Sequence, residues 1–198
     1  IETTNPLLSS SNVDDVYMGM QAADFLGSPS HIEGLSDVMQ RFAFNRQDYP
    51  KGNPADHAMR IMERMTGRAL PQDLSAYDIQ GQPDTATRLR SSMLYRSMDD
   101  NFDQSLRYLE GELLSLERQL DDLVSLHRPR VARAYYNLRA ATGYEFGFDL
   151  DEDLIGNQDA VHAWREAIRD RGLRCAGDWW WQGESIDIDG TPKVSKAS

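Results

Sequence analysis

The sequence has one cysteine, Cys175, in 198 residues. A single thiol excludes a disulfide within the chain, and it also excludes a zinc site of the cysteine-rich kind. Proteins of reducing compartments commonly lack disulfides. The sequence therefore favours a cytoplasmic location.

Long apolar runs are missing as well. No run approaches the roughly 18 apolar residues that mark a membrane-spanning helix. Residues 1–12 have neither the cationic start nor the apolar centre of a signal peptide. We expect no membrane span and no secretion through a signal peptide.

Basic residues are outnumbered, with 21 Lys and Arg against 32 Asp and Glu, a net charge of -11. Affinity for duplex nucleic acid comes mainly from cationic side chains that neutralise phosphates. We therefore expect no main role in direct nucleic-acid binding. The apolar content is 40%, which is low for a compact enzyme of this length, so we expect protein partners to cover part of the surface.

Catalytic and metal-binding motifs are missing too. There is no Gly-x-Ser-x-Gly elbow, no Walker phosphate loop and no dinucleotide-binding Gly-x-Gly-x-x-Gly. The acidic run Asp149–Asp153 starts like a calcium loop, but Leu154 occupies its glycine position and Ala160 the position of its closing glutamate. We predict no catalytic residues, no metal site and no cofactor.

One stretch is unusually regular. Apolar residues recur in it at alternating spacings of four and three. This pattern is typical of the contact line of a coiled coil or an antiparallel helix pair. We call the line the leucine seam; it consists of Phe102, Leu106, Leu109, Leu113, Leu116, Leu120 and Leu123.

The segment around the seam predicts one long helix over about residues 84–127, and Pro129 is expected to kink it. The predicted fold is mainly α: a helical bundle organised on this central helix, with a short extended or β C-terminal segment. The predicted parts are a flexible arm at 1–10, a helical domain at 11–172, and an aromatic extended segment with a frayed tail at 173–198.

Local signals predict where the shorter helices begin. Ser11 is expected to cap one helix, and Ser30 the next as part of a capping box. Asn53 followed by Pro54 predicts a third start. Asn157 is expected to cap the last helix.

The C-terminal segment has strand-like composition, and Asp189-Gly190 predicts a hairpin turn there. Neighbours on a strand point to opposite faces, so three consecutive tryptophans cannot all point inward. They are a candidate partner interface, with a tryptophan-capped core as the alternative: Trp179, Trp180 and Trp181.

Methionine is frequent in the N-terminal third. Met59, Met62 and Met65 follow one another on the helix predicted after Asn53. Methionine fills irregular cores, and it also lines adaptable grooves that bind partner helices. Both interpretations stay open.

Two helical segments, residues 53–68 and 157–169, resemble segments of the large internal or ejection proteins of tailed bacteriophages and related mobile elements. The resemblance implies a virion-associated helical protein that is packed and released with the genome. It adds the virion as a possible location. The acidic charge departs from a simple DNA-lining role, and no catalytic residue transfers.

The sequence thus predicts a non-enzymatic structural or assembly protein that self-associates through the leucine seam or the tryptophans. A bacteriophage virion component is its most specific form. The expected partners are proteins, in a homo-oligomer or a larger assembly. One alternative is an adaptor that binds a partner helix in a methionine-rich groove; another is an enzyme with a carboxylate site at 149–153.

Overall fold

A computed structural model describes residues 4–44, 49–68, 84–171, 177–182 and 184–188. The fold of these residues is mainly α-helical, with two small two-stranded sheets. The chain forms two compact units, which we call unit 1 (residues 1–112) and unit 2 (residues 113–198). None of the helices in the described ranges is both long and apolar enough to cross a membrane.

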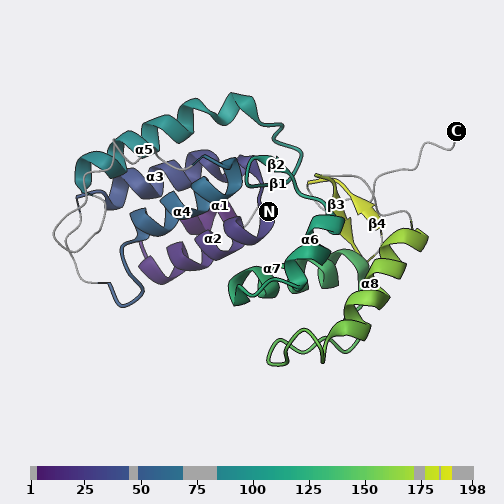
Figure 1. The fold of residues 1–198 in the computed structure, drawn as a ribbon. Helices are drawn as coiled ribbons and strands as arrows, with labels where there is room; N and C mark the ends of the chain where they lie inside the picture. The colour runs from purple at the N-terminus through teal and green to yellow at the C-terminus, as the bar shows by residue number, and fades with distance from the viewer. Residues whose placement is uncertain (1–3, 45–48, 69–83, 172–176, 183, 189–198) are drawn as a thin grey trace, which may run out of the picture. The chain divides into compact units, whose positions relative to one another are not determined.

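Unit 1 is a bundle of short helices, coloured purple to teal in Figure 1. Helix α3 packs mainly against α4 and α5, and α1 packs against α2. The elements are α1 (Thr4–Leu8), α2 (Val13–Leu26), the 3-10 helix η1 (Pro29–His31), α3 (Ile32–Phe42), α4 (Pro54–Thr66), α5 (Thr85–Ser97), the 3-10 helix η3 (Asp99–Asn101), β1 (Tyr108–Leu109) and β2 (Glu112–Leu113). The second residue of β2 already belongs to unit 2.

The core of unit 1 is built mainly from aliphatic and methionine side chains. Ile32, Leu35 and Met39 project from one face of α3 and are fully buried. The core also contains an ion pair: the Arg88 guanidinium donates from Nε and Nη2 to the two carboxylate oxygens of Asp56, at 2.7 and 2.9 Å. This bidentate pair links α4 to α5.

In its described residues, unit 2 has three helices and a hairpin, coloured green to yellow in Figure 1. Helix α6 packs against α7 and α8, and α7 also packs against β3. The elements are α6 (Leu116–Leu123), α7 (Arg128–Thr142), α8 (Gln158–Arg171), β3 (Trp179–Trp181) and β4 (Glu184–Ile186).

The core of unit 2 combines aliphatic side chains with a cluster of aromatic rings. Trp164 of α8 is fully buried, and its indole N–H donates to the Thr142 hydroxyl at 3.2 Å. Its ring lies against the rings of Tyr135, Phe146 and Phe148, with centroids 5.7 to 5.9 Å apart. Aromatic pairs at this spacing are favourable beyond their buried area.

The long central helix predicted over residues 84–127 is not confirmed. Helix α5 ends at Ser97, and α6 begins only at Leu116. Between them lie η3, β1 and β2. Pro129 does not kink a long helix, because it lies in the first turn of α7, where a proline fits well.

Backbone hydrogen bonds explain this break. The Tyr108 N–H donates to the Gly27 carbonyl at 2.7 Å, and the Gly111 N–H donates to the Met65 carbonyl at 3.0 Å. These carbonyls lie at the ends of α2 and α4, where intrahelical partners run out. Gly111 has a φ of 79°, and a Cβ there would lie 2.6 Å from the Thr66 carbonyl oxygen. Gly111 therefore suits a close turn and not a helix interior.

Several helix boundaries follow the predicted signals. Asn53 caps α4, and its side chain accepts the Ala55 N–H at 2.8 Å. Asn157 immediately precedes α8, although its side chain binds the loop before the helix. The side-chain cap at Asn53 is confirmed, whereas at Asn157 only the start of the helix follows the prediction. A local signal was sufficient at Asn53 because that cap depends on neighbouring residues only.

The N-terminal region differs in local details. Residues 4–8 of the predicted arm form α1, and Leu8 is buried in the core. Asn12 and not Ser11 caps α2, accepting the Asp14 N–H at 3.1 Å. No capping box forms at Ser30, which lies inside η1.

The β character of the C-terminal segment is present in a short hairpin. Strand β3 pairs antiparallel with β4, with Trp179 opposite Ile186. Trp181 pairs with Glu184 at the other end of the ladder. The predicted turn at Asp189-Gly190, the tail after it and Cys175 lie outside the described residues.

Candidate protein-binding groove

Unit 2 has an open groove of about 440 Å³ beside the first half of α8. Its lining comes from the end of α6, the loop before α8, and α8 itself. The lining residues are Val124, Leu154, Ile155, Gln158, Asp159, Val161, His162 and Arg165.

Much of the apolar lining is exposed. Leu154 is 50% exposed, Ile155 81% and Val124 41%, and Leu126, two residues further along, is fully exposed. Single apolar side chains are common on protein surfaces. Several around one concave site instead indicate a surface that binds another molecule, most often a protein.

Hydrogen bonds order the loop that presents Leu154 and Ile155. The Asn157 Nδ2 donates to the carbonyls of Asp149 at 2.7 Å and Asp153 at 3.1 Å, and its Oδ1 accepts the Asp149 N–H at 2.8 Å. The Asp153 carboxylate accepts the Ile155 N–H at 3.0 Å. The loop conformation is fixed by these polar groups, so the apolar pair is held at the surface.

The same bonds give the acidic loop a structural role. The Asp149 carboxylate accepts the Asp151 N–H at 2.9 Å, and the Asp153 carboxylate accepts backbone N–H groups in a similar way. Such side-chain acceptors are typical of Asx turns. Within the described residues, no group of three or more His, Cys, Asp or Glu side chains could hold a metal ion.

The rim of the groove carries charges of both signs. Asp159 and Arg165 are exposed on α8, and neither forms an ion pair or a side-chain hydrogen bond with any residue that the structure describes. His162 lies between them, with its Nε2 3.6 Å from the Glu166 carboxylate. The groove therefore combines an apolar floor with available charges.

The leucine seam is divided between the two units. Phe102, Leu106 and Leu109 belong to unit 1, and the last four residues of the seam belong to unit 2. Leu116, Leu120 and Leu123 pack in the core of unit 2, mainly on α7. Leu113 is 37% exposed, while its neighbour Leu114 is buried. The seam thus forms no continuous line, and most of its buried residues contribute to local cores.

The three tryptophans occupy different environments. Trp179 is buried, Trp180 packs partly against the core of unit 2, and Trp181 is 54% exposed. The Trp180 indole N–H is buried without a hydrogen-bond partner among the described residues. Trp181 is therefore the most exposed of the three.

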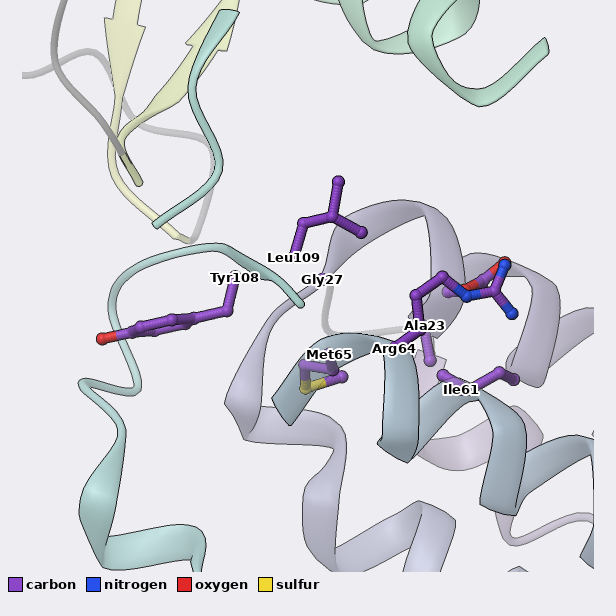
Figure 2. Close-up of a pocket in the computed structure, with 8 residues that line it drawn as sticks. Ala23, Gly27, Ile61, Arg64, Met65, Tyr108 and Leu109 are labelled. Atoms are coloured by element: carbon purple, nitrogen blue, oxygen red, sulfur yellow. The ribbon is translucent and has the colours of Figure 1, made fainter. Parts of the chain in front are cut away.

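Met59, Met62 and Met65 are all buried in the core of unit 1. In this conformation they fill the core, and they form no exposed groove. The small pocket beside Met65, which Figure 2 shows between α2, α4 and β1, measures only about 10 Å³. That volume suits about one water molecule and no partner side chain.

Sequence reasoning missed the groove. One sequence feature could have indicated it: the apolar pair Leu154-Ile155 lies within an acidic loop, where polar turn residues are expected. A second signal was α8, whose inward positions are apolar at helical spacing while its outward positions carry both charges. Comparison of the chain with protein-family models, curated proteins and solved structures finds no match.

Proposed function

We propose that this chain is a non-enzymatic assembly protein, and that it self-associates through the groove of unit 2. The supporting observation is the exposed apolar pair Leu154-Ile155, which the Asn157 hydrogen bonds hold out of the core. An exposed apolar surface of this kind is costly in water, and burial against a protein surface relieves that cost.

The groove replaces the leucine seam as the main contact surface in this proposal. Leu116, Leu120 and Leu123 already pack inside unit 2, so they cannot also bind a second molecule without unfolding. Trp181 offers a smaller additional contact. A bacteriophage virion component remains the most specific form of the proposal, and its support is the resemblance of residues 53–68 and 157–169.

Sedimentation velocity over a micromolar to millimolar range tests the proposal. We expect the wild-type mass to rise above that of one chain as the concentration increases. Ile155→Asp should keep the chain monomeric, because it places a charge in the apolar contact. Met93→Asp is the matched control, since Met93 is also an exposed apolar residue but lies on α5 of unit 1.

Two results would contradict the proposal. The first is a wild-type chain that stays monomeric over the whole range. The second is an oligomer that Ile155→Asp leaves unchanged, because self-association would then use another surface. Circular dichroism of each variant must first show unchanged helix content.

A further inference from the structure

We propose that α1 is an acid-operated latch on unit 1: it stays docked on α2 and α3 while His31 is neutral, and protonation of His31 releases it while the rest of the unit stays folded. This inference concerns unit 1 and does not depend on the groove of unit 2. Three features support it: the close seat of α1 on two glycines, the small number of other contacts that hold it, and the surroundings of the His31 ring.

Helix α1 packs closely against one glycine of α2 and one of α3. A Cβ at Gly19 would lie 2.9 Å from the Leu8 backbone nitrogen, and a Cβ at Gly34 would lie 3.0 Å from the Leu8 Cδ1. Glycine destabilises a helix interior relative to alanine. The close approach of α1 gives both glycines a reason to be there, and we call this contact the α1 seat.

Outside the α1 seat, the contacts that the structure describes for α1 are modest. Of its five residues, Thr4 and Leu8 are buried. Arg41 of α3 donates to the Leu8 carbonyl at 2.7 Å and to the Ser9 carbonyl at 3.2 Å. Carbonyls at the end of a helix lack intrahelical partners, so this clamp suits the site. A short segment with so little buried surface is expected to open locally before the core does.

The His31 ring contacts α1 and is fully buried. The Asn5 Nδ2 donates to the Ser30 carbonyl at 3.4 Å, which directs the Asn5 Oδ1 toward the His31 Nδ1, 3.1 Å away. Because this oxygen can only accept, Nδ1 carries the hydrogen of the neutral ring. The Nε2 atom is buried without a hydrogen-bond partner among the described residues. Protonation therefore adds an N–H and a positive charge where none of these residues accepts them.

Release of α1 takes Asn5 away from the ring and opens that side of His31 to water. In the docked state burial lowers the pKa of His31 from 6.5 to about 4, and contact with water restores the ordinary value. Above pH 6.5 the ring is neutral in both states. Between pH 6.5 and 4 only the released state binds the proton, so each unit of pH favours release about tenfold. Below pH 4 both states bind it, and the shift ends.

The charged groups on the neighbouring elements do not stabilise a positive ring. Neither α1 nor η1 contains a carboxylate. On α3, Glu33 and Asp37 are exposed, and Arg41 binds the carbonyls of α1. Arg107 donates to the last carbonyls of α2, just before η1, and the amino group of residue 1 acts on His31 in the same direction as burial. These cations disfavour a second positive charge.

Hydrogen exchange of the full chain, measured at pH 6.5 and at pH 4 and corrected for the intrinsic rates, tests the latch. The Ser9 and Ser10 N–H groups donate to the Asn5 and Leu7 carbonyls, both at 3.1 Å. A helix of five residues does not persist once it leaves its seat, so these amides report release. Their protection should fall by on the order of a hundredfold between the two pH values, while that of α4 amides changes much less.

Two pairs of variants separate the titration from the seat. His31→Gln should keep the protection of Ser9 and Ser10 nearly independent of pH, whereas His57→Gln, at a half-buried histidine of α4, should respond to acid as the wild type does. Gly19→Ala should reduce the protection already at pH 6.5, because its Cβ meets the Leu8 backbone. Met18→Ala, at the exposed neighbouring position, should leave it unchanged.

Three results would overturn the latch. The first is loss of protection at Ser9 and Ser10 only together with α4, which would mean that acid unfolds the whole unit. The second is a His31→Gln variant that loses protection as steeply as the wild type. The third, which needs no variant, is an NMR titration of the folded wild type in which the His31 ring protonates near pH 6.5.

Discussion

The two units differ in the composition of their cores and in how many large apolar side chains they expose. The core of unit 1 is rich in methionine and also contains the Asp56–Arg88 ion pair and His31, whereas in the core of unit 2 aliphatic side chains surround the rings of Trp164, Tyr135 and Phe148. Of the 13 large apolar side chains exposed in the described residues, nine belong to unit 2. The comparison indicates that unit 2, although the shorter part of the chain, is where a partner surface should be sought.

The largest effect is expected when the Trp164 side chain is removed from the core of unit 2. Trp164→Ala should lower the free energy of unfolding of unit 2 by about 5 kcal/mol, through lost burial and the cavity left behind. Hydrogen exchange should then accelerate more in α6, α7 and α8 than in α2, α3 and α4. The milder Trp164→Phe should lose roughly half as much. Equal acceleration in all six helices would contradict the assignment of separate cores.

The buried ion pair tests unit 1 in the same way. Asp56→Ala leaves the Arg88 guanidinium buried without its carboxylate and should cost about 3–4 kcal/mol of unfolding free energy, measured by urea denaturation. The double variant Asp56→Ala/Arg88→Met should be less destabilised than Asp56→Ala alone, because no charge remains to be buried. A double variant that is worse than either single change would show that the pair contributes net stability.

His31 makes the stability of unit 1 depend on pH. Its side chain is fully buried, its Nδ1 lies 3.1 Å from the Asn5 Oδ1, and burial lowers its pKa from 6.5 to about 4. Between those two pH values the unfolded chain binds a proton that the folded chain does not. Stability should therefore be constant above pH 6.5 with respect to this group and fall by on the order of 3 kcal/mol as the pH decreases to 4.

The matched variant for this prediction is His31→Gln, which keeps a hydrogen-bonding side chain but cannot titrate. Its unfolding free energy should depend less steeply on pH between 6.5 and 4 than that of the wild type, whatever its stability at neutral pH. Parallel pH profiles for the two proteins would exclude His31 as the source of the acid sensitivity.

The smallest effect is expected at Leu113 of the leucine seam. Leu113 is partly exposed, so Leu113→Asp should change the free energy of unfolding by less than about 1 kcal/mol. Leu116→Asp, three residues later, should unfold unit 2, because Leu116 lies in its core. Thermal melts of the two variants distinguish this from a continuous coiled coil, in which both changes would be severe.

The failure of the long-helix prediction has a specific physical cause. The seam was identified from a spacing that helix periodicity explains well, and α6 does use Leu116, Leu120 and Leu123 in that way. Before α6, however, Tyr108 and Gly111 form backbone bonds with the ends of α2 and α4. These partners are more than 40 residues away in the sequence, so no local pattern reports them.

The sequence by itself determined the mainly helical class and the cap at Asn53, because each depends on residues close together in the chain. Only the tertiary structure decided that the methionines lie inside unit 1 and that Leu154 and Ile155 lie outside the core of unit 2. Burial depends on which distant elements pack together. For the groove it also depends on the Asn157 hydrogen bonds, which spacing alone cannot reveal.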